Sequence, residues 1–131
     1  MSRARTLVLA ILASSTLWAK AEEIPVPSFA KGPTEFVSRY GDRLLIGDKS
    51  KKELRFWFNI SGANYHQCYM SGTASAVDPD TYLHIDGQCA LELKVLPGAV
   101  VLMDNEAKCK QTHCGTRAGI HGATFLRKRG N

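Results

Sequence analysis

The sequence predicts an all-β fold: an antiparallel β-meander or small barrel, stapled by disulfides, that follows a cleaved signal peptide. Apolar and polar residues alternate over several short segments, which is the period of a half-buried strand. Turn-forming residues separate these segments. Four cysteines lie beyond an apparent export signal, and an even count in a small exported domain is typical of disulfides.

The first 21 residues have the layout of a signal peptide, and we expect them to be removed. Arg3 and Arg5 precede an apolar run over 7–13, and the residues 19–21 (AKA) fit a small-x-small cleavage site. The apolar run is too short to span a bilayer, and the alternative is a buried N-terminal helix. No later segment is apolar enough to cross a membrane, so we expect a soluble periplasmic or secreted protein.

Residues 1–21 contribute most of the net charge. The whole chain carries +5, and removal of residues 1–21 leaves 110 residues with a charge of +2. A charge this small argues against nucleic acid as a partner. The length allows one domain. We expect a signal peptide over 1–21, an N-terminal arm over 22–40 and a single β domain over 41–131.

The elements follow from the local pattern. The arm is rich in proline up to residue 33, and 34–40 is the only stretch that could form a helical turn or two. Alternation predicts a strand over 54–60 and extended segments over 65–76 and 81–96, the latter with a candidate interruption at 86–87. Strand residues around 100–102 and 120–126 complete the series.

The cysteine spacing suggests a disulfide pattern. The midpoint of Cys68 and Cys89 falls between residues 78 and 79, where the sequence DPD predicts a turn. A hairpin folded there places the two cysteines opposite each other, and opposed residues of antiparallel strands lie about 4.5–5.5 Å apart, which suits a disulfide. We therefore predict the pair Cys68–Cys89 and, by elimination, Cys109–Cys114.

The second predicted pair closes a short polar loop. Such a loop binds well because it loses little conformational entropy on docking. The candidate binding residues are those of the loop and one that follows it: Lys110, Gln111, Thr112, His113 and Arg117. The alternative is a stapled turn with a structural role only.

Other chemistry finds little support in the sequence. Zinc would need two close ligand pairs, and only Cys109 and Cys114 are near each other, at a spacing longer than the usual knuckle. Hydrolase, zinc-protease and phosphate-loop motifs are missing. We therefore expect no metal, no cofactor and no enzymatic activity. Aromatic residues on the outward side of the strands are a candidate interface or sugar-binding platform: Trp57, Tyr65, Tyr69 and Tyr82. The alternative is that they shield the edge of the sheet.

Several segments resemble small exported bacterial β-domains of the lysozyme-inhibitor type. They are 62–68 (GANYHQC), 72–74 (GTA), Cys89, 109–118 (CKQTHCGTRA) and 122–127 (GATFLR), and the resemblance covers roughly 54–128. The stapled loop is similar in outline to that of the inhibitors of vertebrate lysozyme, in which a disulfide-closed loop with a histidine enters the lysozyme cleft. Residues 109, 110, 114 and 115 match that loop, whereas His113 is shifted by one position.

The resemblance implies a periplasmic binding module that inhibits, or protects against, a cell-wall hydrolase such as a lysozyme. Its partner would be a protein, and its contact the disulfide-closed loop. The alternative is a non-catalytic envelope protein that binds anionic lipid or polysaccharide through the basic tail at 127–129.

Overall fold

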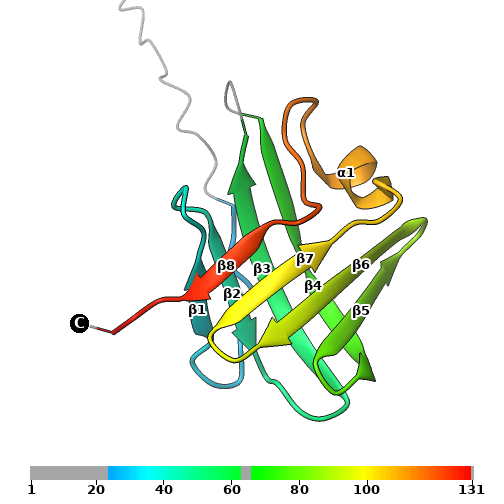
Figure 1. Cartoon of the computed structure of the whole chain (residues 1–131). Coiled ribbons are helices and arrows are strands. Elements are labelled where there is room, and N and C mark those ends of the chain that lie inside the picture. Colours follow the sequence, from blue (N-terminus) through cyan, green and yellow to red (C-terminus); the bar gives the residue numbers. More distant parts are fainter. Residues whose placement is uncertain (1–23, 63–65, 131) are drawn as a thin grey trace, which may run out of the picture.

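Eight antiparallel strands close into a barrel in which each strand pairs with its neighbours in sequence and β1 pairs with β8 (Figure 1). The computed structural model describes residues 24–62 and 66–130, so the expected signal peptide over 1–21 lies outside them. The expected antiparallel all-β barrel is confirmed. The elements are β1 (Thr34–Val37), β2 (Arg43–Gly47), β3 (Glu53–Ser61), β4 (Gln67–Asp78), β5 (Thr81–Asp86), β6 (Cys89–Leu96), β7 (Ala99–Met103), α1 (Lys108–His113) and β8 (Thr124–Arg127).

Alternate residues of the strands fill the inside of the barrel. A closed barrel of eight strands is just wide enough for side chains to fill its interior. The largest fully buried side chains come from seven strands, β2 to β8, and from the segment before β8: Leu44, Leu54, Phe56, Phe58, Met70, Tyr82, Leu91, Leu93, Val100, Leu102, Ile120 and Phe125. The interior is therefore a packed hydrophobic core, and candidate binding surfaces lie at the ends and on the outside.

Residues 34–37 form β1, so the helical turn expected over 34–40 is wrong. Phe36 pairs with Leu44 of β2 on one side and with Arg127 of β8 on the other. Its side chain is only 6% exposed. This strand closes the barrel, and its partner β8 lies at the far end of the sequence. Four residues carry too little alternation to reveal such a strand by themselves.

The extended segment 81–96 is two strands joined by a tight turn. Gly87 has φ 58°, a left-handed backbone that glycine adopts without strain. Across this turn Asp86 pairs with Cys89. The chain therefore reverses direction at 87–88, and Cys89 begins β6 instead of lying on the strand that pairs with β4.

The arm ahead of β1 lies along the outside of the barrel. Hydrogen bonds attach it to β4, β3 and the β2–β3 loop: Tyr69 Oη to Pro25 O (3.4 Å), Arg55 Nη1 to Ser28 O (2.6 Å), and Ala30 N to both carboxylate oxygens of Asp48 (3.1 and 3.2 Å). Trp57 points outward from β3 on this side and yet is only 3% exposed. Its ring contacts that of Tyr69, with centroids 6.4 Å apart.

Two of the aromatic residues considered as an exposed interface are thus buried. Trp57 lies on the side along which the arm runs, and Tyr82 is inside the barrel at 2% exposure, with its hydroxyl donating to Ser50 O at 3.0 Å. The expectation that these two side chains are exposed is therefore wrong. Tyr65 lies outside the described residues.

Candidate functional site

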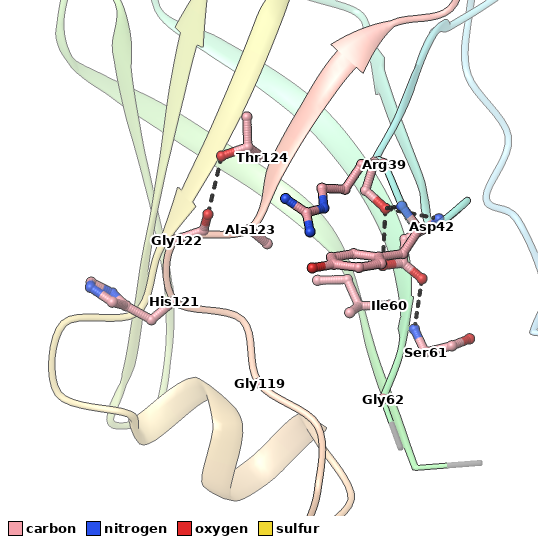
Figure 2. A pocket seen from close by; sticks show the side chains of 12 residues that line it. Arg39, Asp42, Ile60, Ser61, Gly62, Gly119, His121, Gly122, Ala123 and Thr124 are labelled. Atoms are coloured by element: carbon pink, nitrogen blue, oxygen red, sulfur yellow. Dashed lines mark hydrogen bonds between the residues drawn. The ribbon is translucent and has the colours of Figure 1, made fainter. Parts of the chain in front are cut away.

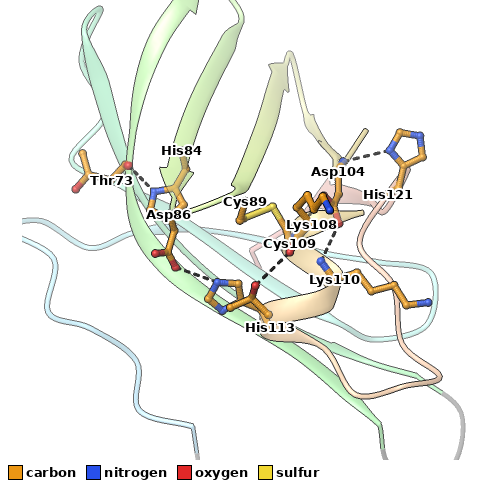
Figure 3. Close-up of a disulfide and its surroundings, with 11 residues drawn as sticks. Thr73, His84, Asp86, Cys89, Asp104, Lys108, Cys109, Lys110, His113 and His121 are labelled. Carbon is orange, nitrogen blue, oxygen red and sulfur yellow. Dashed lines mark hydrogen bonds and ion pairs between the residues drawn. A yellow bond between two sulfur atoms is a disulfide. The ribbon is translucent and has the colours of Figure 1, made fainter. Parts of the chain in front are cut away.

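Both disulfides join the α1 segment to the barrel, and the predicted pairing is wrong. Cys109 is bonded to Cys89 at the start of β6, and Cys114 is bonded to Cys68 near the start of β4. Figure 3 shows the bond between Cys89 and Cys109 beside the helix. The hairpin argument fails because β5 lies between β4 and β6, so Cys68 and Cys89 are not on neighbouring strands.

Asp104 holds the start of α1. Its carboxylate oxygens accept hydrogen bonds from the backbone N–H groups of Cys109 (3.1 Å) and Lys110 (2.9 Å), and the residue is 4% exposed. These N–H groups belong to the first helical turn, which has no partners of its own. Ala107 at the N-cap has no side-chain oxygen, so Asp104 takes over that role. Its own N–H donates to Nδ1 of His121 (3.1 Å), which ties the later loop to the same point.

The residues between α1 and β8 cover this end of the barrel. Ala118 and Ile120 point inward and are 3% and 1% exposed. At Gly62, after β3, a Cβ atom would lie 2.7 Å from the carbonyl oxygen of Arg117. The loop backbone therefore packs directly against the end of β3.

The candidate binding residues lie together at this end, but mostly on a helix instead of a loop. Lys110, Gln111 and Thr112 are exposed on α1, and Arg117 is exposed in the segment that follows. The Thr112 hydroxyl donates to Lys108 O at 3.2 Å. Within the described residues, neither Lys110 nor Arg117 forms an ion pair with a carboxylate. Both cations are therefore available to a partner.

His113 is placed differently from the other four. Its Nε2 lies 3.0 Å from Oδ2 of Asp86 at the end of β5, and its side chain is 23% exposed (Figure 3). Through this contact α1 is also attached to β5, which lies between the two strands, β4 and β6, that hold the helix by disulfides. Sequence analysis missed Asp86 in this role because the pair spans 27 residues.

Two hollows open at the α1 end. One of about 470 Å³ lies beside the helix and is lined by Ala107, Lys110, Gln111, Cys114, Gly115 and Thr116. The other, of about 500 Å³, lies between the β1–β2 turn and residues 119–124 (Figure 2). At the rim of the second hollow, the Arg39 guanidinium lies 4.8 Å from the centre of the Tyr40 ring. Sequence analysis missed both residues because they stand in a short turn without a motif.

The described residues contain no group of three histidine, cysteine or acidic side chains that could hold a metal ion. No described helix has the length and apolarity needed to cross a membrane.

The structural class of the protein is a closed antiparallel barrel that carries a short helix at one end, attached by two disulfides. Comparisons of the chain with protein-family models, curated proteins and solved structures found no match. A functional conclusion therefore has to come from the geometry of the site.

Proposed function

We propose that this protein is an exported binding module that inhibits, or protects against, a cell-wall hydrolase such as a lysozyme, and that it binds through α1 and Arg117. The attachment of α1 carries this proposal. Two disulfides and the buried Asp104 hold a six-residue helix whose exposed side chains are polar. A binding surface that is already ordered loses little conformational entropy when it docks.

The exposed cations suit the chemistry of such a target. A glycosidase cleft contains two carboxylates that act on the glycosidic bond. An ammonium or guanidinium group forms charge-assisted hydrogen bonds with a carboxylate, and these are about twice as strong as neutral ones. Lys110 and Arg117 are both exposed and have no ion-pair partner within the described part of the chain. Docking would therefore not have to break an existing salt bridge.

Net charge adds little to this recognition. A mature charge of +2 gives no long-range attraction toward a basic lysozyme. The affinity must then come from short-range contacts around α1. The hollow beside Lys110 and Gln111 offers room there for a side chain of the partner.

Export is the other part of the proposal. Both disulfides need an oxidising compartment to form and persist. The intact mass of the protein recovered from the periplasm or medium is expected to match a chain that begins at Glu22. A full-length chain with reduced cysteines in the cytoplasm would contradict export.

The binding test uses the oxidised protein as exported, against a panel of lysozymes and other peptidoglycan hydrolases. Inhibition of cell-wall lysis and calorimetric binding are measured. The variant Lys110→Ala/Arg117→Ala is expected to lose at least about 2 kcal/mol of binding free energy, about thirtyfold in Kd. Its melting temperature should stay unchanged because both side chains are exposed.

A second candidate function follows from the opposite end of the barrel. A hollow of about 550 Å³ there includes Lys31, Lys49 and Arg127 in its lining, and Arg129 follows nearby in the basic tail. This cluster suits anionic lipid or polysaccharide, and such binding should weaken with salt.

One variant serves both candidates. Lys49→Ala/Arg127→Ala removes two cations at the end away from α1. It is expected to keep hydrolase binding, which makes it the matched control for the α1 variant. The second function replaces the first if three results are obtained together. No hydrolase binds the unchanged protein, Lys49→Ala/Arg127→Ala loses binding to a polyanion, and Lys110→Ala/Arg117→Ala still binds that polyanion normally.

A further inference from the structure

The β1–β2 turn carries two large exposed side chains, Arg39 and Tyr40, at the rim of the hollow of about 500 Å³ that separates it from residues 119–124 (Figure 2). Tyr40 is 76% exposed, the highest value among the large apolar and aromatic side chains of the described residues. Tyrosine and arginine are enriched at binding surfaces because each combines a large contact area with polar groups. Neither candidate function proposed above uses this pair.

Hydrogen bonds hold the turn in one shape. The Ser38 hydroxyl accepts from the backbone N–H groups of Tyr40 and Asp42 (both 3.1 Å) and donates to Asp42 Oδ2 (3.1 Å). Asp42 Oδ1 accepts from the backbone N–H of Ser61 (2.9 Å), which ties the turn to the end of β3 (Figure 2). Gly41 has φ 87°, a left-handed backbone that glycine adopts without strain. The turn is therefore ordered before a ligand arrives, so docking costs little conformational entropy.

One face of the Tyr40 ring is covered and the other is open. The Arg39 guanidinium lies over the ring, 4.8 Å from its centre, and cation–π attraction holds the two together. The tyrosine nevertheless keeps most of its exposure, so its opposite face meets solvent. Trp57 and Tyr82, considered from the sequence as a sugar-binding platform, are buried instead. Tyr40 is thus an aromatic surface that a ligand can reach.

The charges that line the hollow cancel. Arg39 contributes one positive charge and Asp42 one negative charge. Arg39 forms no ion pair within the described residues, so its N–H groups remain available as donors. His121 is neutral, because its Nδ1 accepts a hydrogen bond from the backbone N–H of Asp104 (3.1 Å) and an accepting nitrogen carries no proton. The hollow therefore suits a neutral ligand that offers both donors and acceptors, more than it suits an anion.

We propose that this hollow binds a neutral saccharide, with one sugar ring against the open face of Tyr40. A sugar ring combines an apolar face of C–H groups, which packs on an aromatic ring, with hydroxyls that donate and accept hydrogen bonds. Arg39 supplies donors for these hydroxyls and the Asp42 carboxylate supplies acceptors. Ile60 and Ala123 add apolar atoms to the lining. The volume lies within the range of about 300–1,000 Å³ that is usual for ligand sites.

The test titrates the oxidised protein with two neutral tetrasaccharides, chitotetraose and cellotetraose. Calorimetry measures the affinity, and NMR of the backbone amides locates the contact. At least one of the two is expected to bind saturably at millimolar concentration or below, with the largest amide shifts in residues 38–42 and 119–124. Binding of a neutral ligand should not change with salt, whereas an anion held by Arg39 would be displaced.

Variants at Tyr40 test the role of the ring. Tyr40→Ala should weaken saccharide binding at least about tenfold and leave the melting temperature unchanged, because the side chain is exposed. Tyr40→Trp keeps an aromatic surface and should restore binding. Its added indole should shift its fluorescence to shorter wavelength when a sugar covers it, against the background of Trp57, which is only 3% exposed. Loss of folding cannot produce this pattern of loss and rescue.

Two control variants change other surfaces. Ile85→Ala truncates a side chain that is 60% exposed and does not line the hollow, so saccharide binding should be unchanged. Lys110→Ala/Arg117→Ala should also keep saccharide binding, because those cations lie outside the hollow. The saccharide site and the proposed hydrolase site can therefore fail or succeed separately.

Three outcomes would overturn the proposal. The first is that neither tetrasaccharide binds at millimolar concentration. The second is that Tyr40→Ala binds as well as the unchanged protein. The third is that binding weakens with salt as it would for an anion held by Arg39.

Discussion

Oδ2 of Asp104 accepts a hydrogen bond from the backbone N–H of Lys110 at 2.9 Å, so a buried carboxylate fixes the backbone of a residue whose side chain is a candidate binding cation. The candidate site and the stability of the barrel end therefore share one residue. Variants at Asp104 and at Lys110 should separate the two properties.

Asp104→Ala is expected to lower the free energy of unfolding by about 1–3 kcal/mol, because the N–H groups of Cys109 and Lys110 lose their acceptor. Asp104→Asn keeps one acceptor oxygen and should lose less. Denaturant unfolding of the oxidised protein measures both. Glu106→Ala, an exposed acid in the same segment, is the control and should change stability by less than about 0.5 kcal/mol. Equal effects of Asp104→Ala and Glu106→Ala would show that the contact contributes nothing.

The two disulfides should differ in their effect on stability. The bond between Cys68 and Cys114 joins residues 46 apart, and that between Cys89 and Cys109 joins residues 20 apart. In the chain-entropy model these loops contribute about 4 and about 3 kcal/mol. We expect the double alanine variant of the longer loop to be the less stable by thermal unfolding. Peptide mapping without reduction checks the pairs themselves, and a Cys68–Cys89 peptide would contradict the structure.

Glu35 should make stability depend on acid pH. The hydrogen bond from Arg43 Nε to Glu35 Oε1 (2.6 Å), with the nearby charges of Arg43 and Lys128, lowers the pKa of the Glu35 carboxyl. A lowered folded pKa gives stability that is present above the unfolded pKa, about 4.3, and is lost as pH falls through the folded pKa.

Glu35→Gln should therefore be less stable than the unchanged protein at pH 7, by no more than about 1 kcal/mol because the pair is partly exposed. The difference should shrink below about pH 4. Unfolding curves at a series of pH values measure it, with Glu53→Gln as a control at an exposed carboxylate without an ion pair in the described residues. A difference that stays constant from pH 7 to pH 3 would rule out this origin.

Gly47 lets the arm lie close to the barrel. A Cβ atom at this position would lie 2.2 Å from the ring of Phe29. Gly47→Ala should therefore displace Phe29 and expose the arm to proteases, while Gly32→Ala, which would meet nothing within 4 Å, should not. Limited proteolysis with N-terminal sequencing measures the cleavage rate. Equal rates in the two variants would show that the contact does not hold the arm.

The sequence predicted those strands whose signal is local. In β3 the alternation of Leu54, Phe56 and Phe58 with polar or outward residues is long enough to define both the strand and its inner face. The sequence did not predict β1 as a strand, because its four residues are defined by pairing to β2 and β8. The strand β8 lies some ninety residues away along the chain. Barrel closure depends on pairing between the two ends of the chain, and local periodicity carries no information about such pairing.

The sequence predicted the exposure of the candidate binding residues on α1, but not the residues that hold the helix in place. Local polarity was sufficient to indicate Lys110 and Gln111 as exposed. The helix itself is too short for periodicity to show, and its capping residue Asp104 stands four positions before the first helical residue. The disulfide prediction failed at Gly87, because a second turn there inserts one more strand between the cysteines.

The disulfides are nested, since the bond from Cys68 to Cys114 encloses that from Cys89 to Cys109. A chain that enters an oxidising compartment from its N-terminus brings Cys68 and Cys89 into contact with oxidants before either of their partners has emerged. The first bond that can form is thus a non-native one, and a later thiolate must attack it before the native pairs can form. Without a catalyst such rearrangement takes minutes to hours. Under the proposed export, the yield of the protein should therefore be governed by a disulfide isomerase more than by an oxidase.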